Sequence, residues 1–449
     1  MILAGAALCL AFNLPGHLSD DSVVQLAQGR SGLYNRWHPP VMAWLLGVMD
    51  GWRRGTGLFV CFDTALIASA FVLLVSIPAK ASWLAAPLAA AFWASPQLII
   101  YPTIVWKDVL FAAAAVAGFT LLAAAAAARR PNLALGLSFA AIPLFVLAAL
   151  TRQNGALVLP FAAAAAGWLA AGRARAAPAV HGLAAGLGGL AVCAALALAA
   201  TAALDALSDH EPSSTFQWEE LQVYDLAGAM RLDPSLALPV LEARAPKLAR
   251  VLRTAGAAAY TPTRVDPLRD LPPIHEGRAV NAAAVAAQWR ALIVGHPLLY
   301  LRTRSIAFAW VLLTPRLDEC LPIYVGVDGP APQMAWLGLS SRYDQRDGAL
   351  EAWADRFAES PIYQHGAWAL AALALLVGFL KRRRPADIAL AAMLASALAF
   401  AASFFVISVA CDYRYLYFLD LATMAAALYA VASATGGDAA GSRGSAMPQ

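Results

Sequence analysis

The sequence predicts an all-α polytopic membrane protein with about ten transmembrane helices and a mostly helical or irregular domain outside the membrane. Its 449 residues are 61% hydrophobic and 13% charged, whereas soluble domains are about 45–50% apolar and about 25% charged. Stretches of about 18–23 residues with almost no charge recur, and this length crosses a bilayer. The net charge of +4 is small and scattered. Intrinsic disorder, a secreted disulfide scaffold and a nucleic-acid partner are therefore excluded.

Ten apolar stretches bounded by charged or turn residues are candidate spans. They are residues 1–14, 58–77, 82–100, 109–128, 133–150, 156–171, 183–204, 362–380, 388–410 and 416–432. The first is short, because about 14 residues rise only ~21 Å as a helix against a hydrocarbon core of ~30 Å. It also lacks the basic residues that begin a signal peptide. We expect either a mis-assigned start codon or a helix in a thinned membrane.

Lys and Arg in short loops predict which side of the membrane each loop occupies. With ten alternating spans, three basic loops fall on one side: Arg129 with Arg130, Arg173 with Arg175, and the run 381–384. We expect this side to be cytoplasmic. Arg53 and Arg54 argue against the assignment, because they fall on the outer side.

The region 205–361 has the composition of a soluble domain inserted between spans. It holds 19 of the 28 acidic and 15 of the 32 basic residues, and its Pro-Pro, Asp-Pro and Gly-Pro pairs predict short helices and loops. Within it, 298–313 is apolar but contains Arg302 and Arg304, and counting it as a span would turn 381–384 outward. We expect an interfacial or re-entrant helix there. The predicted parts are a membrane module 1–204 with a first outer loop 15–57, the outer domain 205–361, C-terminal spans 362–434, and a disordered cytoplasmic tail 435–449.

The five cysteines divide between the spans and the outer side. Cys9, Cys61 and Cys193 lie in spans, where cysteine is a small packing residue. Cys320 and Cys411 both fall on the outer side, where an oxidising compartment permits a disulfide. A disulfide between them and two separate thiols both remain open.

Ionisable residues gather in the outer loops. Asp20 and Asp21 follow the first span, and the same segment ends in the rigid turn His38-Pro39-Pro40. Acidic residues are also common in the first turn of a helix, so the two aspartates have a purely structural interpretation. Their position directly after a span favours a functional one.

Three basic residues begin or end other spans on the same side. Lys107 stands beside Asp108, and the pair could neutralise each other or anchor the helix at the interface. Arg152 and Arg414 each occupy a short outer turn, where basic residues are disfavoured, and Tyr415 follows Arg414. Three cations at the outer ends of different spans could converge on one anion.

Asp63 lies inside a candidate span. A charged residue at this depth is costly and commonly functional. A buried structural ion pair is an equally good interpretation.

This order of motifs resembles the GT-C superfamily of integral-membrane glycosyltransferases, in particular the protein O-mannosyltransferases and the bacterial aminoarabinose transferase. The resemblance rests on a short first span, an Asp-containing outer loop closing with His38-Pro39-Pro40, Lys107-Asp108 heading a span, and Arg152 in a later outer turn. It covers roughly the first 205 residues. The chain has Asp20-Asp21-Ser22 where the family commonly has Asp-Glu, so either aspartate can be the family's acidic residue.

The resemblance implies an inverting transfer of a sugar from a polyprenyl-phosphate donor to an acceptor hydroxyl, on the periplasmic face of a bacterial inner membrane. It assigns Asp21, or else Asp20, as general base, a role worth ~10²–10⁴-fold in rate. Lys107, Arg152 and Arg414 are candidates to bind the donor phosphate. The supporting residues are His38, Asp108, Tyr415 and Asp63. No cofactor is required, although Asp20, Asp21 and His38 could hold a divalent metal.

Two other functions use the same layout. A transporter or flippase of lipid-linked sugars would place its ionisable groups near the bilayer midplane and often shows repeated halves, neither of which is visible here. A polysaccharide polymerase or ligase would use a diphosphate-linked donor, and a structural envelope protein would leave Arg152 and Arg414 unexplained. The sugar, the acceptor (glycan, lipid or protein) and the oligomeric state stay open.

Overall fold

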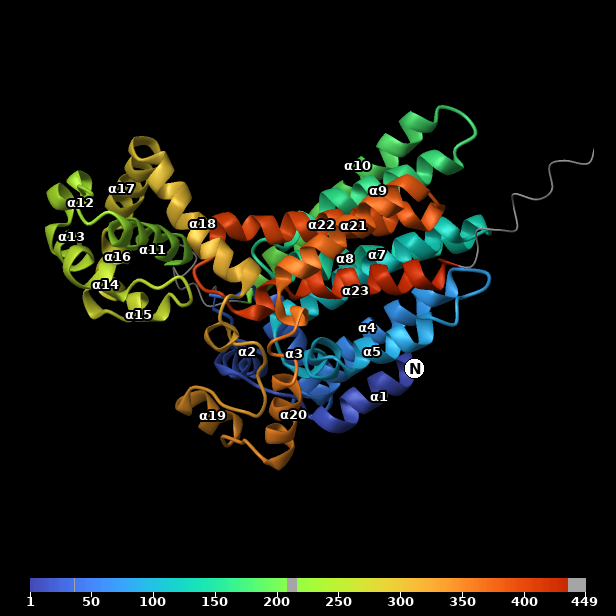
Figure 1. Cartoon of the computed structure of the whole chain (residues 1–449), viewed down its shortest axis with the longest axis horizontal. Coiled ribbons are helices and arrows are strands. Elements are labelled where there is room, and N and C mark those ends of the chain that lie inside the picture. The colour runs from blue at the N-terminus through green and yellow to red at the C-terminus, as the bar shows by residue number, and fades with distance from the viewer. Residues whose placement is uncertain (36, 208–215, 435–449) are drawn as a thin grey trace, which may run out of the picture.

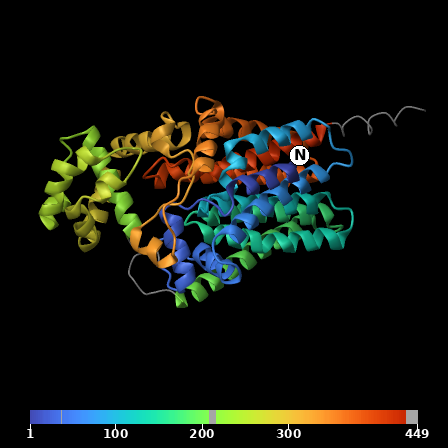
Figure 2. The same ribbon diagram turned by 90° about the horizontal axis from the view of Figure 1, so that it is seen from below.

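The computed structural model describes residues 1–35, 37–207 and 216–434, and in these residues the protein is helical throughout (Figures 1 and 2). The described chain contains no β-strand, only isolated bridges between His17 and Ile104 and from Val327 to Leu18 and Arg342. The helices form a long bundle, with a group of short helices at one end of it.

Within the described residues, eight segments are helical, long and apolar enough to cross a bilayer, which indicates an integral membrane protein. They are α4 (Gly57–Ser76), α7 (Lys107–Ala127), α8 (Pro131–Thr151), η2 with α9 (Gly155–Arg173), α10 (Pro178–Ala206), α21 (His365–Arg382), α22 (Pro385–Ile407) and η6 with α23 (Tyr413–Ala432).

Eight of the ten predicted spans are confirmed as long apolar helices in the described residues, and the other two candidates form shorter helices. The first and third candidates form the short helices α1 (Ile2–Asn13) and α5 (Ala85–Ala94), the latter followed by α6 (Pro96–Ile99). Each of these short helices ends two residues before a proline. Leu14 precedes Pro15 and Ser95 precedes Pro96, and both residues have extended ψ angles, of 140° and 153°. The α conformation is disfavoured directly before proline.

The basic loops gather at one end of the bundle. Arg173 Nη2 donates hydrogen bonds to the carbonyl oxygens of Ala125 at 2.6 Å and Ala128 at 3.1 Å, so the loop after α9 meets the loop after α7. Arg384 Nη1 donates to the Ser433 carbonyl oxygen at 2.9 Å, beside the end of α23. We call the opposite end, where α4, α7, α9, α21 and α23 begin, the loop end.

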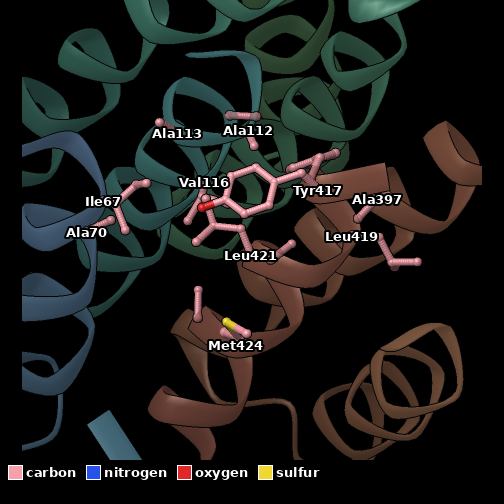
Figure 3. Packing of buried hydrophobic residues seen from close by; sticks show 14 of the residues in the cluster. Ile67, Ala70, Ala112, Ala113, Val116, Ala397, Tyr417, Leu419, Leu421 and Met424 are labelled. Atoms are coloured by element: carbon pink, nitrogen blue, oxygen red, sulfur yellow. The ribbon is translucent and has the colours of Figure 1, made fainter. Parts of the chain in front are cut away.

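Helix α7 is the centre of the bundle. Nine-tenths of its most apolar stretch is buried, and its alanines let neighbouring helices approach closely. Figure 3 shows Ala112 and Val116 of α7 among Ile67 of α4 and Leu421 of α23. By contrast α10 is almost wholly exposed, as expected for a helix that faces lipid.

The segment between α1 and α4, the turn before α7 and the region before α21 contain the remaining elements, all at the loop end. They are α2 (Asp20–Ser31), α3 (Val41–Trp52), η1 (Tyr101–Thr103), α11 (Phe216–Leu232), α12 (Pro239–Arg244), α13 (Pro246–Val251), η3 (Leu252–Gly256), α14 (Ala257–Ala259), α15 (Asp266–Arg269), α16 (Pro272–Val280), α17 (Ala282–Gly295), α18 (Pro297–Leu313), η4 (Leu317–Cys320), α19 (Ala331–Leu337), α20 (Gln345–Asp355) and η5 (Pro361–Tyr363). The helices from α11 to α18 share a hydrophobic core of their own, which stands apart from the bundle in Figure 1.

Helix α18 fastens this group to the bundle. Its Arg304 is fully buried, pairs with Asp225 of α11 at 2.8 Å, and donates to the carbonyl oxygens of Phe405 and Ser408 at the end of α22. The interfacial position expected for 298–313 stays a prediction. The tail expected at 435–449 lies outside the described residues.

Cys320 and Cys411 form a disulfide with their Cα atoms 5.0 Å apart, as the oxidising-side placement suggested. It ties η4 to the turn before α23. Cys9 and Cys193 are free and buried, and Cys61 is free and partly buried.

Candidate functional site

The two neighbouring aspartates begin α2. Ser19 caps the helix, and the Ser19 backbone N–H donates to Ser22 Oγ at 3.2 Å. Ser22 Oγ in turn donates to the Val105 carbonyl oxygen at 2.6 Å, and Trp106 Nε1 donates to Ser19 Oγ at 2.8 Å. These contacts hold the start of α2 against the start of α7. The helix-start interpretation of the aspartates is therefore correct, and it also brings Asp21 to the basic end of α7.

Asp21 is held from two sides. Arg414 Nη2 lies 2.9 Å from Asp21 Oδ2, and His38 Nε2 lies 3.2 Å from Asp21 Oδ1. Lys107 Nζ lies 2.7 Å from His38 Nδ1. An ammonium group can only donate, so Nδ1 accepts, and the proton of a neutral His38 sits on Nε2 and is donated to Asp21.

The electrostatics of Asp21 and His38 follow from these contacts. Burial opposes ionisation of Asp21, but Arg414 and the hydrogen bond from His38 outweigh it, so the pKa of Asp21 lies well below its ordinary value. Burial and the nearby Lys107 lower the pKa of His38 to about 4, against the opposing effect of Asp21. Near neutral pH the pair is therefore a carboxylate and a neutral imidazole.

A second ion pair lies beside the first. Arg152, which follows α8, is paired with the buried Asp108 of α7. Its guanidinium carbon lies 5.4–5.6 Å from the ring centres of Phe400, Phe404 and Tyr415. Aromatic faces attract a cation and keep water from it.

Arg414 links the two ion pairs. Its Nε lies 3.9 Å from Asp108 Oδ2, and its Nη2 lies 3.1 Å from Asp412 Oδ2. The guanidinium carbon sits 4.8 Å from the centre of the Trp106 ring. Three cations thus face three carboxylates in one partly buried cluster.

Most residues singled out from the sequence meet in this cluster: Asp21, His38, Lys107, Asp108, Arg152, Arg414 and Tyr415. Two do not. Asp20 is exposed, and its pKa is raised by partial burial and by the negative charges of Asp328 and Asp21. Asp63 is buried inside α4, and neither carboxylate oxygen has a hydrogen-bond partner in the described chain.

Sequence reasoning missed the residues that hold Arg414 in place. Asp412, which lies two residues before Arg414, was not predicted as a site residue. Behind it, Asp420 accepts hydrogen bonds from His365 Nδ1 at 2.9 Å and from the Tyr413 hydroxyl at 2.6 Å, which fixes η6. Ionisable residues within apolar segments are expected to be paired, so His365 and Asp420 carried a usable signal.

The proposed metal ligands do not fit a divalent ion. Asp21 is already bound to Arg414 and His38. The Lys107 ammonium lies on the other side of His38, so a divalent cation would meet two positive charges at close range. Among the described residues no three metal-binding side chains converge.

Fold and site define an all-helical integral membrane protein with a partly buried cluster of charges at one end of its bundle. Comparison with protein families, curated proteins and solved structures finds no match to this chain.

Proposed function

We propose that this chain is an inverting membrane glycosyltransferase that moves a sugar from a polyprenyl-phosphate donor to an acceptor hydroxyl. The observation that carries the proposal is the convergence of one carboxylate, Asp21, with the three cations Lys107, Arg152 and Arg414. The order of the motifs, which resembles the GT-C glycosyltransferases, adds to it.

Asp21 is the proposed general base. The acceptor oxygen attacks the anomeric carbon, its proton passes to Asp21, and the bond from the anomeric carbon to the phosphate oxygen breaks. Asp21 is preferred to Asp20, because only Asp21 lies next to the cations that would receive the departing phosphate. His38 orients the carboxylate by donating to Oδ1.

The cations stabilise the departing polyprenyl phosphate. Groups held in place beforehand need no reorganisation as its charge develops, and arginine can bind phosphate through two hydrogen bonds. Without donor, the carboxylates Asp21, Asp108 and Asp412 neutralise these cations. A bound phosphate therefore competes with Asp21 for Arg414.

This competition activates the base. In the structure Arg414 keeps the pKa of Asp21 low, which makes Asp21 a weak proton acceptor. When phosphate draws Arg414 away, the Oδ2 atom of Asp21 becomes free and more basic. Asp21 then gains basicity only when the donor is present.

The membrane context agrees with a lipid-linked donor. The cluster lies at the loop end, where apolar helices stop, so a prenyl tail can stay in lipid while its phosphate reaches the cations. The basic loops at the other end favour a cytoplasmic position for that end and a periplasmic one for the site, in a bacterial inner membrane. The acceptor is a glycan, lipid or protein hydroxyl.

The experiment compares transfer from polyprenyl-monophosphate and polyprenyl-diphosphate sugars by the purified full-length protein in lipid. We expect turnover with the monophosphate only. The Asp21→Asn variant should lose ~10²–10⁴-fold in rate, and the neighbouring Asp20→Asn should retain most of it. Arg152→Ala and Arg414→Ala should weaken binding of polyprenyl monophosphate. Wild-type turnover in both aspartate variants, or use of the diphosphate donor alone, contradicts the proposal.

A further inference from the structure

Helix α3 presents one apolar face that nothing in the described chain covers. Trp44, Val48 and Trp52 recur every four residues and are 41%, 40% and 86% exposed, so they form one stripe along the helix. The opposite face is buried, with Met42 and Leu46 in the core beneath the site. An amphipathic helix with an exposed tryptophan stripe needs an apolar partner or a membrane interface.

The helix is fixed firmly on its other side. A Cβ atom on Gly29 of α2 would lie 2.2 Å from the Ala43 carbonyl oxygen, so α2 and α3 pack backbone to backbone. Helix α3 also contacts α4 and α8. The stripe is therefore held in a set direction rather than free to turn inward.

Positive charge marks the end of the stripe. Asp50 is buried and accepts hydrogen bonds from Arg30 at 2.8 Å and Arg54 at 2.9 Å. Arg53 is exposed, and Arg54 has 73% of its side chain exposed. These three arginines and one aspartate leave two positive charges in excess beside Trp52.

The position along the chain points to the bilayer surface. Helix α3 ends at Trp52, and the long apolar helix α4 begins at Gly57, so the end of α3 lies at the level where α4 enters the membrane. Twelve residues rise only ~18 Å, too little to cross ~30 Å of hydrocarbon. Tryptophan is enriched at this level, and Arg pairs with lipid phosphates there.

We infer that α3 is an interfacial anchor: its Trp44, Val48 and Trp52 stripe inserts among the headgroups of the surrounding bilayer, and Arg53 and Arg54 bind anionic phospholipid. This contact accounts for two arginines on the side of the membrane where they are disfavoured. It is independent of the proposed transferase activity. Since His38-Pro39-Pro40 leads directly into α3, the anchor also sets the level of His38 relative to the membrane.

A spin label on Val48→Cys tests the inference in full-length protein whose partly buried Cys61 is replaced by alanine. Collision rates with oxygen, which concentrates in lipid, and with a water-soluble nickel complex report the surroundings. Leu187→Cys on lipid-facing α10 and Val294→Cys on α17 are matched controls, because both positions are exposed. We expect the Val48 label to resemble the one at Leu187, with high oxygen and low nickel accessibility.

Two results overturn the inference. Nickel accessibility equal to that at Val294 places the stripe in water, and low accessibility to both reagents means that protein, such as a second copy of the chain, covers it.

The charge is tested in vesicles of phosphatidylcholine with and without phosphatidylglycerol. Phosphatidylglycerol should raise the ratio of oxygen to nickel accessibility at the Val48 label. Replacing both Arg53 and Arg54 by Gln should remove this effect, and Arg290→Gln should not. An effect that survives the double replacement contradicts the role of the arginines.

Discussion

At the scale of single residues, the site combines groups that satisfy one another in the absence of ligand. Asp21 is the pivot, because His38 and Arg414 hold its two oxygens separately. In the proposed reaction, the donor phosphate competes with Asp21 for Arg414. The contact between Asp21 and His38 need not change. His38 therefore positions the Asp21 carboxylate, and Arg414 keeps it a weak proton acceptor.

The histidines give this arrangement a pH dependence. Burial is the main cause that lowers the pKa of both His38 and His17 to about 4 from 6.5. Between these values the unfolded chain binds more protons than the folded chain, so stability falls as the pH is lowered from 6.5 to 4. Each histidine contributes about 3 kcal/mol to this loss.

We therefore expect His38→Gln and His17→Gln each to reduce the loss of unfolding free energy between pH 6.5 and pH 4 by about 3 kcal/mol. Glutamine does not titrate and can still donate to Asp21. The measurement is thermal unfolding in detergent across this pH range, with the exposed His181→Gln as control. An acid sensitivity unchanged from that of the wild type would show that these imidazoles are already charged in the folded protein.

At the scale of elements, the turn η6 decides where Arg414 points. The Tyr413 hydroxyl is bound to Asp420 of α23, and the Tyr413 carbonyl oxygen lies 3.0 Å from His365 Nε2 of α21. The Cys320–Cys411 disulfide restrains the chain just before this turn. Arg414 is thus carried by a turn anchored on three sides, which suits a cation that must be in place before charge develops.

Helix α4 contains the one buried carboxylate singled out from the sequence that joins no partner. Asp63 costs stability, because burying a polar group without a hydrogen bond costs about 1–3 kcal/mol. We expect Asp63→Leu to raise the unfolding free energy by about that amount and to leave transfer unchanged. Asp387→Leu is the matched control, and it should lower the unfolding free energy by about 2 kcal/mol, because Asp387 is bound to Arg382 and Tyr429. A less stable Asp63→Leu protein would indicate that Asp63 has a partner, such as a ligand.

The sequence predicted the long apolar helices well, because their length and lack of charge are local properties. It also predicted that Arg152, Arg414, Lys107 and Asp21 lie at the same end of the bundle, because counting the spans gives the end at which each loop lies. It did not predict the break before Pro96, which divides the segment 82–100 into α5 and α6, whereas the short first helix was expected.

The partners within the site were beyond the sequence. Nothing local indicates that Arg152 pairs with Asp108 rather than Asp412, or that Phe400 and Phe404 enclose its guanidinium group. These contacts join helices far apart along the chain, so only the packed bundle defines them. The isolation of Asp63 is a tertiary property for the same reason.

At the scale of the whole molecule, the charges divide the bundle into two ends with different tasks. One end carries the short basic loops after α7, α9 and α21. The other carries the α11–α18 group (Figure 1), together with the charge cluster and the α3 stripe. In the proposed reaction, a donor held in the bilayer meets an acceptor in water at such an end, so the orientation of the chain would decide which compartment receives the product.

Cysteine labelling of cells tests this orientation. In the Cys61→Ala background, exposed residues are replaced one at a time: Ser31 and Val294 at the loop end, and Arg130 and Arg383 at the basic end. Because basic loops stay in the cytoplasm, an impermeant maleimide should label the first two in intact spheroplasts and the last two only after lysis. Labelling of Ser31 and Val294 from opposite sides would contradict a common loop end for α2 and the α11–α18 group. Complete reversal would place the charge cluster, and with it the proposed transfer, on the cytoplasmic face, where the acceptor would have to be a cytoplasmic molecule.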